Sequence, residues 1–235
     1  MKTLTLALAA SLATSLALAT AACDAQSPTD PAATTPATTP AHAPASAHAA
    51  NSTAATPAAP KLQADLRALW NDHVVQTRAY AMAVNAGDSG AAAEAADGVV
   101  ANAKTLSGAV AGFYGEAAGE RMMELLGGHW GAVKAMTDSG HADDAAASQA
   151  AMTTLLANAD EIAAFLSGAN PNLPADAVRG LLVAHGAHHA AQIKQIMAGD
   201  MAAEVETWAA MQAHMDVIAD ALAGAIAKQF PDKVA

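Results

Sequence analysis

The sequence predicts an all-α protein: a helical bundle of three antiparallel helical hairpins, preceded by a signal peptide and a disordered tether. Three observations lead to this fold class. After Lys61 the apolar residues recur at helical spacing, the breaks between them carry Gly, Asp, Asn or Pro, and the whole pattern returns every 56 residues. A four-helix bundle with fused or broken helices is the alternative architecture.

Residues 1–22 have the three parts of a secretory signal. Met1 and Lys2 form a short positive segment, an apolar stretch runs from Leu4 to Leu18, and small residues follow up to Ala22. The apolar stretch is too short to span a bilayer comfortably. We therefore expect the protein to be exported.

The single cysteine, Cys23, directly follows this segment. The run from Thr20 to Cys23 resembles a lipobox, which predicts lipidation of Cys23 and attachment to the periplasmic face of a bacterial membrane. Lipoboxes usually carry Leu, Val or Ile where Thr20 stands, so cleavage by ordinary signal peptidase, leaving a soluble protein, is the alternative. Residues 23–60 are rich in Ala, Thr and Pro and predict a disordered tether.

Residues 61–235 hold every Trp, Tyr and Phe and are long enough for one substantial core. They contain ten Lys and Arg against twenty Asp and Glu, so no basic surplus is available for nucleic acid. One cysteine cannot form an internal disulfide or a Cys-based zinc or iron–sulfur site. Neither a Gly-x-Ser-x-Gly elbow nor a His-Glu-x-x-His helix is present, so binding is expected ahead of catalysis. No protein partner can be named.

The predicted helices follow in order from these breaks. The first hairpin has a helix over about 62–86, a turn at 87–90 and a second helix ending near 114–115. The second hairpin turns at 138–140 and stops at 167–172, where Pro171 disfavours helix before it. The third starts at 174–176, turns at 199–200 and runs to 229–231.

The repeat units are about 67–122, 123–178 and 179–234. Polar residues recur at matching positions of the three units: His73, His129 and His185 in the first helices, and Asn102, Asn158 and His214 in the second helices. His73 lies about 15 residues before the centre of its turn and Asn102 about 13 after it, so the two face one another in an antiparallel hairpin. The same spacing pairs the other four residues. We expect one polar layer across the bundle, on its inward face.

The layer has three interpretations. A buried hydrogen-bond network would only set the register of the hairpins. A metal site is the second, with His73, His129, His185 and His214 as ligands for Zn, Cu or Ni. Haem between two opposed His is the third and less favoured.

Other residues are expected to support this layer or to lie outside it. Asp72, Arg78 and Asp220 could orient its members, or form ordinary surface ion pairs. His188 and His189 follow His185 at i+3 and i+4, a spacing that can chelate a metal. The positions that match His188 in the other two units hold Gln76 and Ala132, and those that match His189 hold Thr77 and Val133, so neither His belongs to the repeat. The sequence therefore favours partly exposed surface positions for His188 and His189.

Three stretches, 69–80 (LWNDHVVQTRAY), 158–172 (NADEIAAFLSGANPN) and 228–233 (KQFPDK), resemble a family of bacterial exported helical proteins without an established activity. The resemblance covers nearly all of 62–233. The matching positions are His73, Arg78, His129, Asn158, Asp160, His185, His214 and Asp220, whereas His188 and His189 fall outside the pattern. It implies the helical fold and the polar layer, and no reaction. Together these features predict an exported, lipid-anchored protein that binds a metal ion or small cofactor, or else a structural or interaction lipoprotein.

Overall fold

The computed structural model describes residues 59–234. The predicted signal peptide, the predicted lipidation site Cys23 and nearly all of the predicted tether lie outside the described residues. Within residues 59–234 the chain is helical throughout and contains no strand, which confirms the predicted all-α class. The helices are α1 (Pro60–Ala86), α2 (Ser89–Tyr114), α3 (Glu116–His141), α4 (Ala145–Ala169), α5 (Ala175–Ala198), α6 (Met201–Gln229) and the short α7 (Pro231–Val234).

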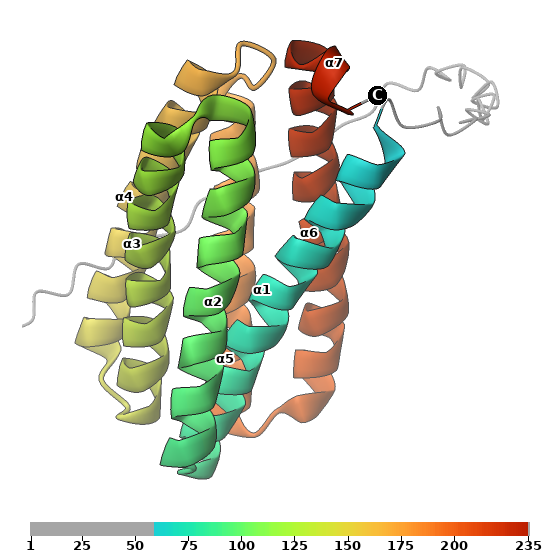
Figure 1. Cartoon of the computed structure of the whole chain (residues 1–235). Coiled ribbons are helices and arrows are strands. Elements are labelled where there is room, and N and C mark those ends of the chain that lie inside the picture. Colours follow the sequence, from blue (N-terminus) through green and yellow to red (C-terminus); the bar gives the residue numbers. More distant parts are fainter. Residues whose placement is uncertain (1–58, 235) are drawn as a thin grey trace, which may run out of the picture. The chain divides into compact units, whose positions relative to one another are not determined.

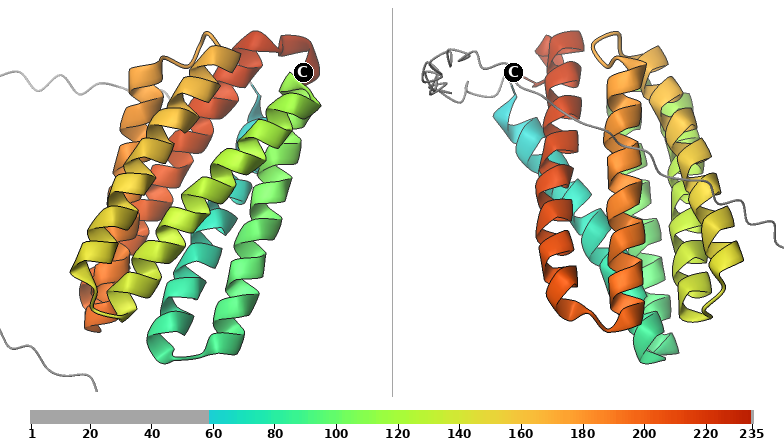
Figure 2. Two further views of the ribbon diagram at one scale, coloured as in Figure 1. Left: turned by 90° about the vertical axis from the view of Figure 1, so that its left-hand side faces the viewer. Right: turned by 180° about the vertical axis from the view of Figure 1, so that it is seen from behind.

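The six long helices alternate in direction (Figure 1), so α1, α3 and α5 run the same way. Each packs against its neighbours in the sequence, and α6 returns to pack against α1, which closes the arrangement. Helices α1, α3 and α5 also contact one another, so they form the inside of the bundle, and α2, α4 and α6 cover the seams between them (Figure 2). Equivalent positions on the three inner helices can therefore meet at one height.

The three hairpin turns share one construction at positions 56 residues apart. A residue with positive φ lies in each turn, directly before the Asp that caps the second helix: Gly87 at 71°, Asp143 at 54° and Gly199 at 69°. The next residue is an Asp whose side chain accepts hydrogen bonds from the first turn of the second helix, as Asp88 does from the N–H of Ala91 at 2.9 Å. Asp144 and Asp200 cap α4 and α6 in the same way. The 56-residue repeat itself stays an interpretation of the sequence, to which these matched turns add an observation.

The predicted turn at 138–140 is wrong. Helix α3 continues through Gly140 to His141, and the turn lies at 142–144. The sequence argument took Gly140 as the residue that breaks the helix, but Asp143 adopts the left-handed conformation instead. Asp is among the few residues other than Gly that tolerate this conformation.

Two apolar clusters fill the bundle above and below its middle. The larger one includes Trp70, Leu125 and Leu182 and occupies the end where α4 joins α5. The smaller one includes Val133 and Ile196, toward the hairpin turns. The His positions of the three inner helices fall between these clusters along the sequence, so the polar layer interrupts the core.

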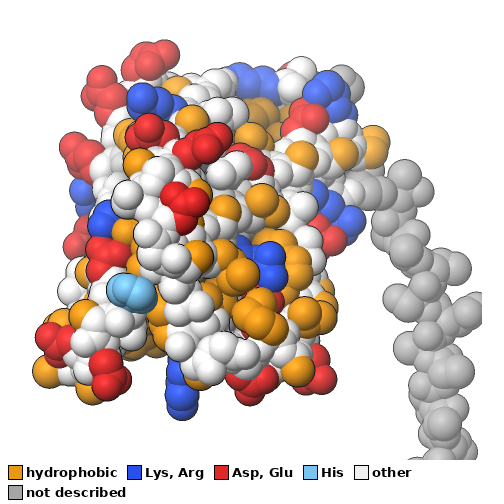
Figure 3. All heavy atoms as spheres, turned by 90° about the horizontal axis from the view of Figure 1, so that it is seen from below, with side chains coloured by type: hydrophobic (Ala, Val, Ile, Leu, Met, Phe, Trp, Pro, Cys, Tyr) orange, Lys and Arg blue, Asp and Glu red, His pale blue; other side chains and the backbone are white. Residues whose placement is uncertain are grey.

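Acidic side chains lie around the edge of the bundle end that carries the three hairpin turns (Figure 3). This agrees with the formal net charge of −11 for the whole chain. Among residues 59–234, no helix is long and apolar enough to cross a membrane.

Candidate metal centre

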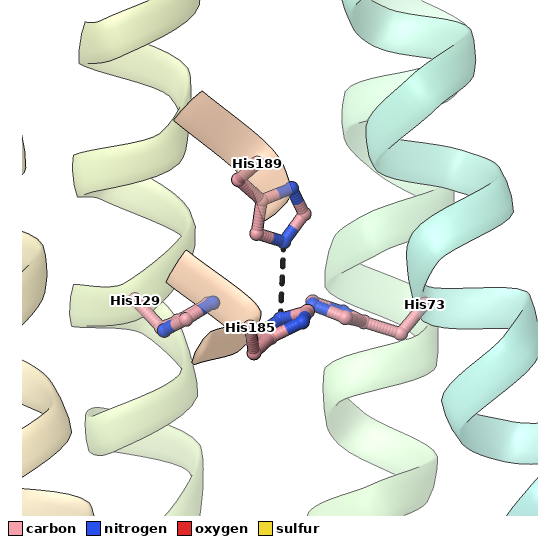
Figure 4. A group of neighbouring side chains, drawn as sticks. All are labelled: His73, His129, His185 and His189. Atoms are coloured by element: carbon pink, nitrogen blue, oxygen red, sulfur yellow. Dashed lines mark hydrogen bonds between the residues drawn. The ribbon is translucent and has the colours of Figure 1, made fainter. Parts of the chain in front are cut away.

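Three imidazoles from the three inner helices meet at the centre of the bundle. His73 comes from α1, His129 from α3 and His185 from α5 (Figure 4). Because these helices run in one direction, residues at 56-residue offsets reach the same height. The structure therefore brings together three of the four His residues that the sequence proposed as ligands.

The fourth imidazole of this group is His189, not His214. His189 lies one turn after His185 on α5, is only 1% exposed, and points from above toward the other rings (Figure 4). The predicted surface position of His189 is therefore wrong. The residues that match His189 in the other two units, Thr77 and Val133, are both buried, so this position faces inward in each hairpin. Both side chains are smaller than an imidazole.

We call His73, His129, His185 and His189 the four-His cluster. Each residue offers a ring nitrogen, and these four nitrogens all lie within 4.8 Å of one another. The rings of His129 and His185 are stacked, with centroids 5.3 Å apart and planes 12° apart. The ring centroids of His73 and His185 lie 5.8 Å apart. His185 Nε2 and His189 Nε2 are 3.0 Å apart. Four ring nitrogens thus surround one small volume.

Four of the eight ring nitrogens of the cluster are buried without a hydrogen-bond partner among the described residues. Nε2 of His73, both nitrogens of His129 and Nδ1 of His185 are buried and unpaired. The hydrogen bond between His185 and His189 joins two of the four rings. Unpaired buried polar atoms cost roughly 1–3 kcal/mol each, so a folded protein seldom keeps several of them together without a ligand.

Burial holds the imidazoles in their neutral form. It lowers the pKa of His73 to about 3, with a further contribution from nearby His129. Burial also lowers the pKa of His129 to about 4, against an opposing effect of Asn158. The pKa values of His185 and His189 lie well below the usual value, again through burial first and neighbouring imidazoles second. A neutral imidazole keeps the lone pair that a metal ion needs.

The outer members of the predicted layer have a different role. Asn102 Nδ2 donates to the backbone carbonyl of Leu69 at 2.9 Å, and Asn158 Nδ2 donates to that of Leu125 at 3.0 Å. His214 Nε2 lies 2.8 Å from the carbonyl of Leu181, which can only accept, so this nitrogen carries the proton. All three contacts span 33 residues, and each links an outer helix to the inner helix of its own hairpin. These residues lock the hairpins and do not join the central cluster.

The predicted supporting residues are distributed over three separate contacts. Asp72 accepts from Asn102 Nδ2 at 2.8 Å, at the edge of the layer. Asp220 is bound by Arg67, with Nη2 to Oδ2 at 2.6 Å. Arg78 pairs through both nitrogens of its fork with Glu204, which is fully buried and also accepts from Gln192. Sequence reasoning missed Glu204, because nothing in its neighbourhood distinguishes it from the exposed acidic residues.

The four imidazole nitrogens determine which metal ions this cluster can bind. Imidazole nitrogen suits Zn²⁺, Cu²⁺, Ni²⁺ and iron, whereas Mg²⁺ and Ca²⁺ prefer oxygen. Two nitrogens bound to one tetrahedral Zn²⁺, at about 2.0–2.1 Å from it, lie roughly 3.3 Å apart. His185 Nε2 and His189 Nε2 lie 3.0 Å apart and all four nitrogens lie within 4.8 Å, so binding of an ion would require the more distant rings to move inward. The cluster is therefore compatible with metal binding.

Comparison of the chain with models of protein families, with curated proteins and with solved structures gives no match. The resemblance to a family of exported helical proteins accordingly stays an expectation from the sequence.

Proposed function

We propose that this protein binds one transition-metal ion, Zn, Cu or Ni, through His73, His129, His185 and His189. The observation that carries the proposal is the convergence of four buried neutral imidazoles on one point with four of their ring nitrogens unpaired. A bound ion would take up lone pairs that otherwise face one another at a cost in free energy.

The contacts favour this proposal over a hydrogen-bond network. A network that set the register would pair the imidazoles with the Asn side chains, but the amide nitrogens of Asn102 and Asn158 donate to backbone carbonyls, and only Asn158 acts on an imidazole of the cluster, that of His129. Haem needs a flat slot between two opposed His, whereas here one ring nitrogen from each of four His lies within 4.8 Å of the others. A small ion fits this arrangement better than a macrocycle.

The proposal includes the cellular setting predicted from the sequence. Residues 1–22 have the character of a signal peptide and Cys23 lies at a lipidation position, so the bundle would be held at the periplasmic face of a membrane on the tether. Lipid attachment at Cys23 is the membrane contact that we propose. No enzymatic reaction is part of the proposal.

Metal titration of protein purified without a His-tag tests the proposal. Binding of Zn²⁺, Cu²⁺ and Ni²⁺ is measured by calorimetry, and Co²⁺ serves as a spectroscopic probe whose visible bands report a tetrahedral site. We expect one ion per chain. Replacing any one of the four ligands by Ala should weaken binding by at least about tenfold, since even the loss of an outer-shell partner of a metal ligand costs this much.

Two controls separate this ligand set from the one that the sequence proposed. His188→Ala changes the residue beside His189 on α5, and His214→Ala removes the fourth predicted ligand; both should leave the affinity within about twofold. Thermal melts in a chelator show which variants remain folded. Absence of micromolar binding by the wild type, or a loss in His214→Ala as large as in His189→Ala, would show that the proposed centre is wrong.

A further inference from the structure

A cavity of about 340 Å³ lies next to the four-His cluster. It is lined by five helices and by the connection between α4 and α5. Its exposed lining residues, which mark the mouth, include Asn172, Ala177 and Lys228. Its buried lining residues include His129 and His185, which are 4% and 1% exposed. The cavity therefore leads from the surface of the bundle to two members of the cluster.

The walls of the cavity are largely apolar, and Asn172, Asp220 and Lys228 are polar residues of the lining besides the two His. They are formed mainly by Leu, Ile, Met, Val and Ala side chains of the larger core cluster. A cavity of about 150 Å³ with walls of this kind takes up benzene, so the space here suits a molecule about twice that size. It also falls within the range of about 300–1,000 Å³ that is usual for small-molecule sites.

The buried part of the cavity lining contains polar side-chain atoms without a hydrogen-bond partner among the described residues. Trp70 lines the cavity, is 6% exposed, and its Nε1–H has no hydrogen-bond partner among the described residues. The Trp70 ring lies edge-on to His73, with centroids 5.9 Å apart. His129 and His185, which also line the cavity, add unpaired ring nitrogens. An indole N–H can only donate, so its missing partner is an acceptor atom.

We infer that this cavity binds a small, uncharged, largely apolar molecule that carries one oxygen acceptor, with the oxygen directed at Trp70 Nε1 and at the four-His cluster. The apolar body replaces empty space along the walls, and the oxygen satisfies the buried indole. The part of this inference that places the ligand beside a metal ion rests on the proposed function. The cavity and its unpaired donor do not depend on the metal.

Two aromatic probes of nearly equal shape test the inference on the whole protein. Acetophenone carries a carbonyl oxygen that can accept a hydrogen bond. Isopropylbenzene has a methyl group in place of that oxygen and cannot accept one. Affinities are measured from the dependence of the melting temperature on probe concentration, with and without Zn²⁺. We expect both probes to bind, and Trp70→Phe to weaken acetophenone relative to isopropylbenzene by about two- to tenfold, the contribution of one hydrogen bond.

A blocking variant and its matched control test the position of the probe. Gly224 lines the cavity, and a Cβ added there meets no atom within 4 Å, so Gly224→Leu can extend into free space. Gly168 lies 56 residues earlier on α4, is equally unobstructed, and does not line the cavity. Gly224→Leu should abolish binding of both probes, and Gly168→Leu should leave it unchanged.

Proximity to the metal is read from Cu²⁺-loaded protein, in which the proton resonances of bound acetophenone should broaden. If Zn²⁺ and Cu²⁺ do not bind but the probes do, the proposed function fails and the ligand cavity stands. If metal binds and neither probe raises the melting temperature, or if Trp70→Phe and Gly224→Leu have no effect on either probe, the inference about the cavity is overturned.

Discussion

Mild acid should lower the free energy of unfolding of the metal-free bundle far more than titration of its exposed groups alone would. The four imidazoles of the cluster are neutral when folded, because burial lowers the pKa of His73 to about 3 and that of His129 to about 4, and holds those of His185 and His189 well below the usual value. In the unfolded chain each has a pKa near 6.5. Below that value the unfolded state binds protons that the folded state does not, so stability falls as the pH falls.

The size of the effect follows from the two pKa values. Between pH 8 and pH 6 the folded imidazoles stay neutral, so only the unfolded state titrates, and each His contributes slightly under about 1 kcal/mol. Four such residues lower the free energy of unfolding by about 3 kcal/mol over this interval. At pH 5 the loss reaches roughly 2 kcal/mol per His, and the sum becomes comparable to the whole stability of a typical domain.

Urea unfolding monitored by circular dichroism, in chelator at pH 8, 7 and 6, measures this dependence. His73→Leu should reduce the pH dependence by about a quarter, because one of four equivalent contributions is removed. His141→Ala is the matched control, since His141 is exposed on α3. A change of less than about 1 kcal/mol between pH 8 and pH 6 in the wild type would refute the argument that four neutral imidazoles are buried together.

Three further predictions concern other parts of the chain. Arg78→Met should cost about 3 kcal/mol of stability, because it leaves the Glu204 carboxylate buried without its charge partner, and adding Glu204→Gln should recover most of that loss; a double-mutant cycle by urea unfolding measures both. Cys23→Ser should abolish labelling by a fatty acid and release the protein from the membrane fraction, and unchanged membrane retention would contradict lipidation. Removal of residues 1–58 should leave the melting midpoint of the bundle unchanged, and a large decrease would show that the removed segment packs against the helices.

Local sequence rules were sufficient for the class and for much of the helix order. The periodicity after Lys61 predicted helices, and the Gly and Asp at 87–88 and 199–200 predicted turns that the structure contains. These features depend on residues close together in the chain. The second turn was misplaced because Asp143 takes the left-handed conformation that a search for Gly does not find.

The sequence also placed His73, His129 and His185 at one height, because equal offsets on helices of one direction give equal heights. It named His214 as the fourth member of the cluster, where the structure has His189. Both positions face inward on their own helices, but α5 lies inside the bundle and α6 lies outside it. An inward side chain on an outer helix reaches the backbone of the neighbouring inner helix, as His214 reaches the carbonyl of Leu181, whereas one on an inner helix reaches the centre. Which helices lie inside is a property of the packing of all six, and so only the tertiary structure determines the ligand set and the cavity beside it.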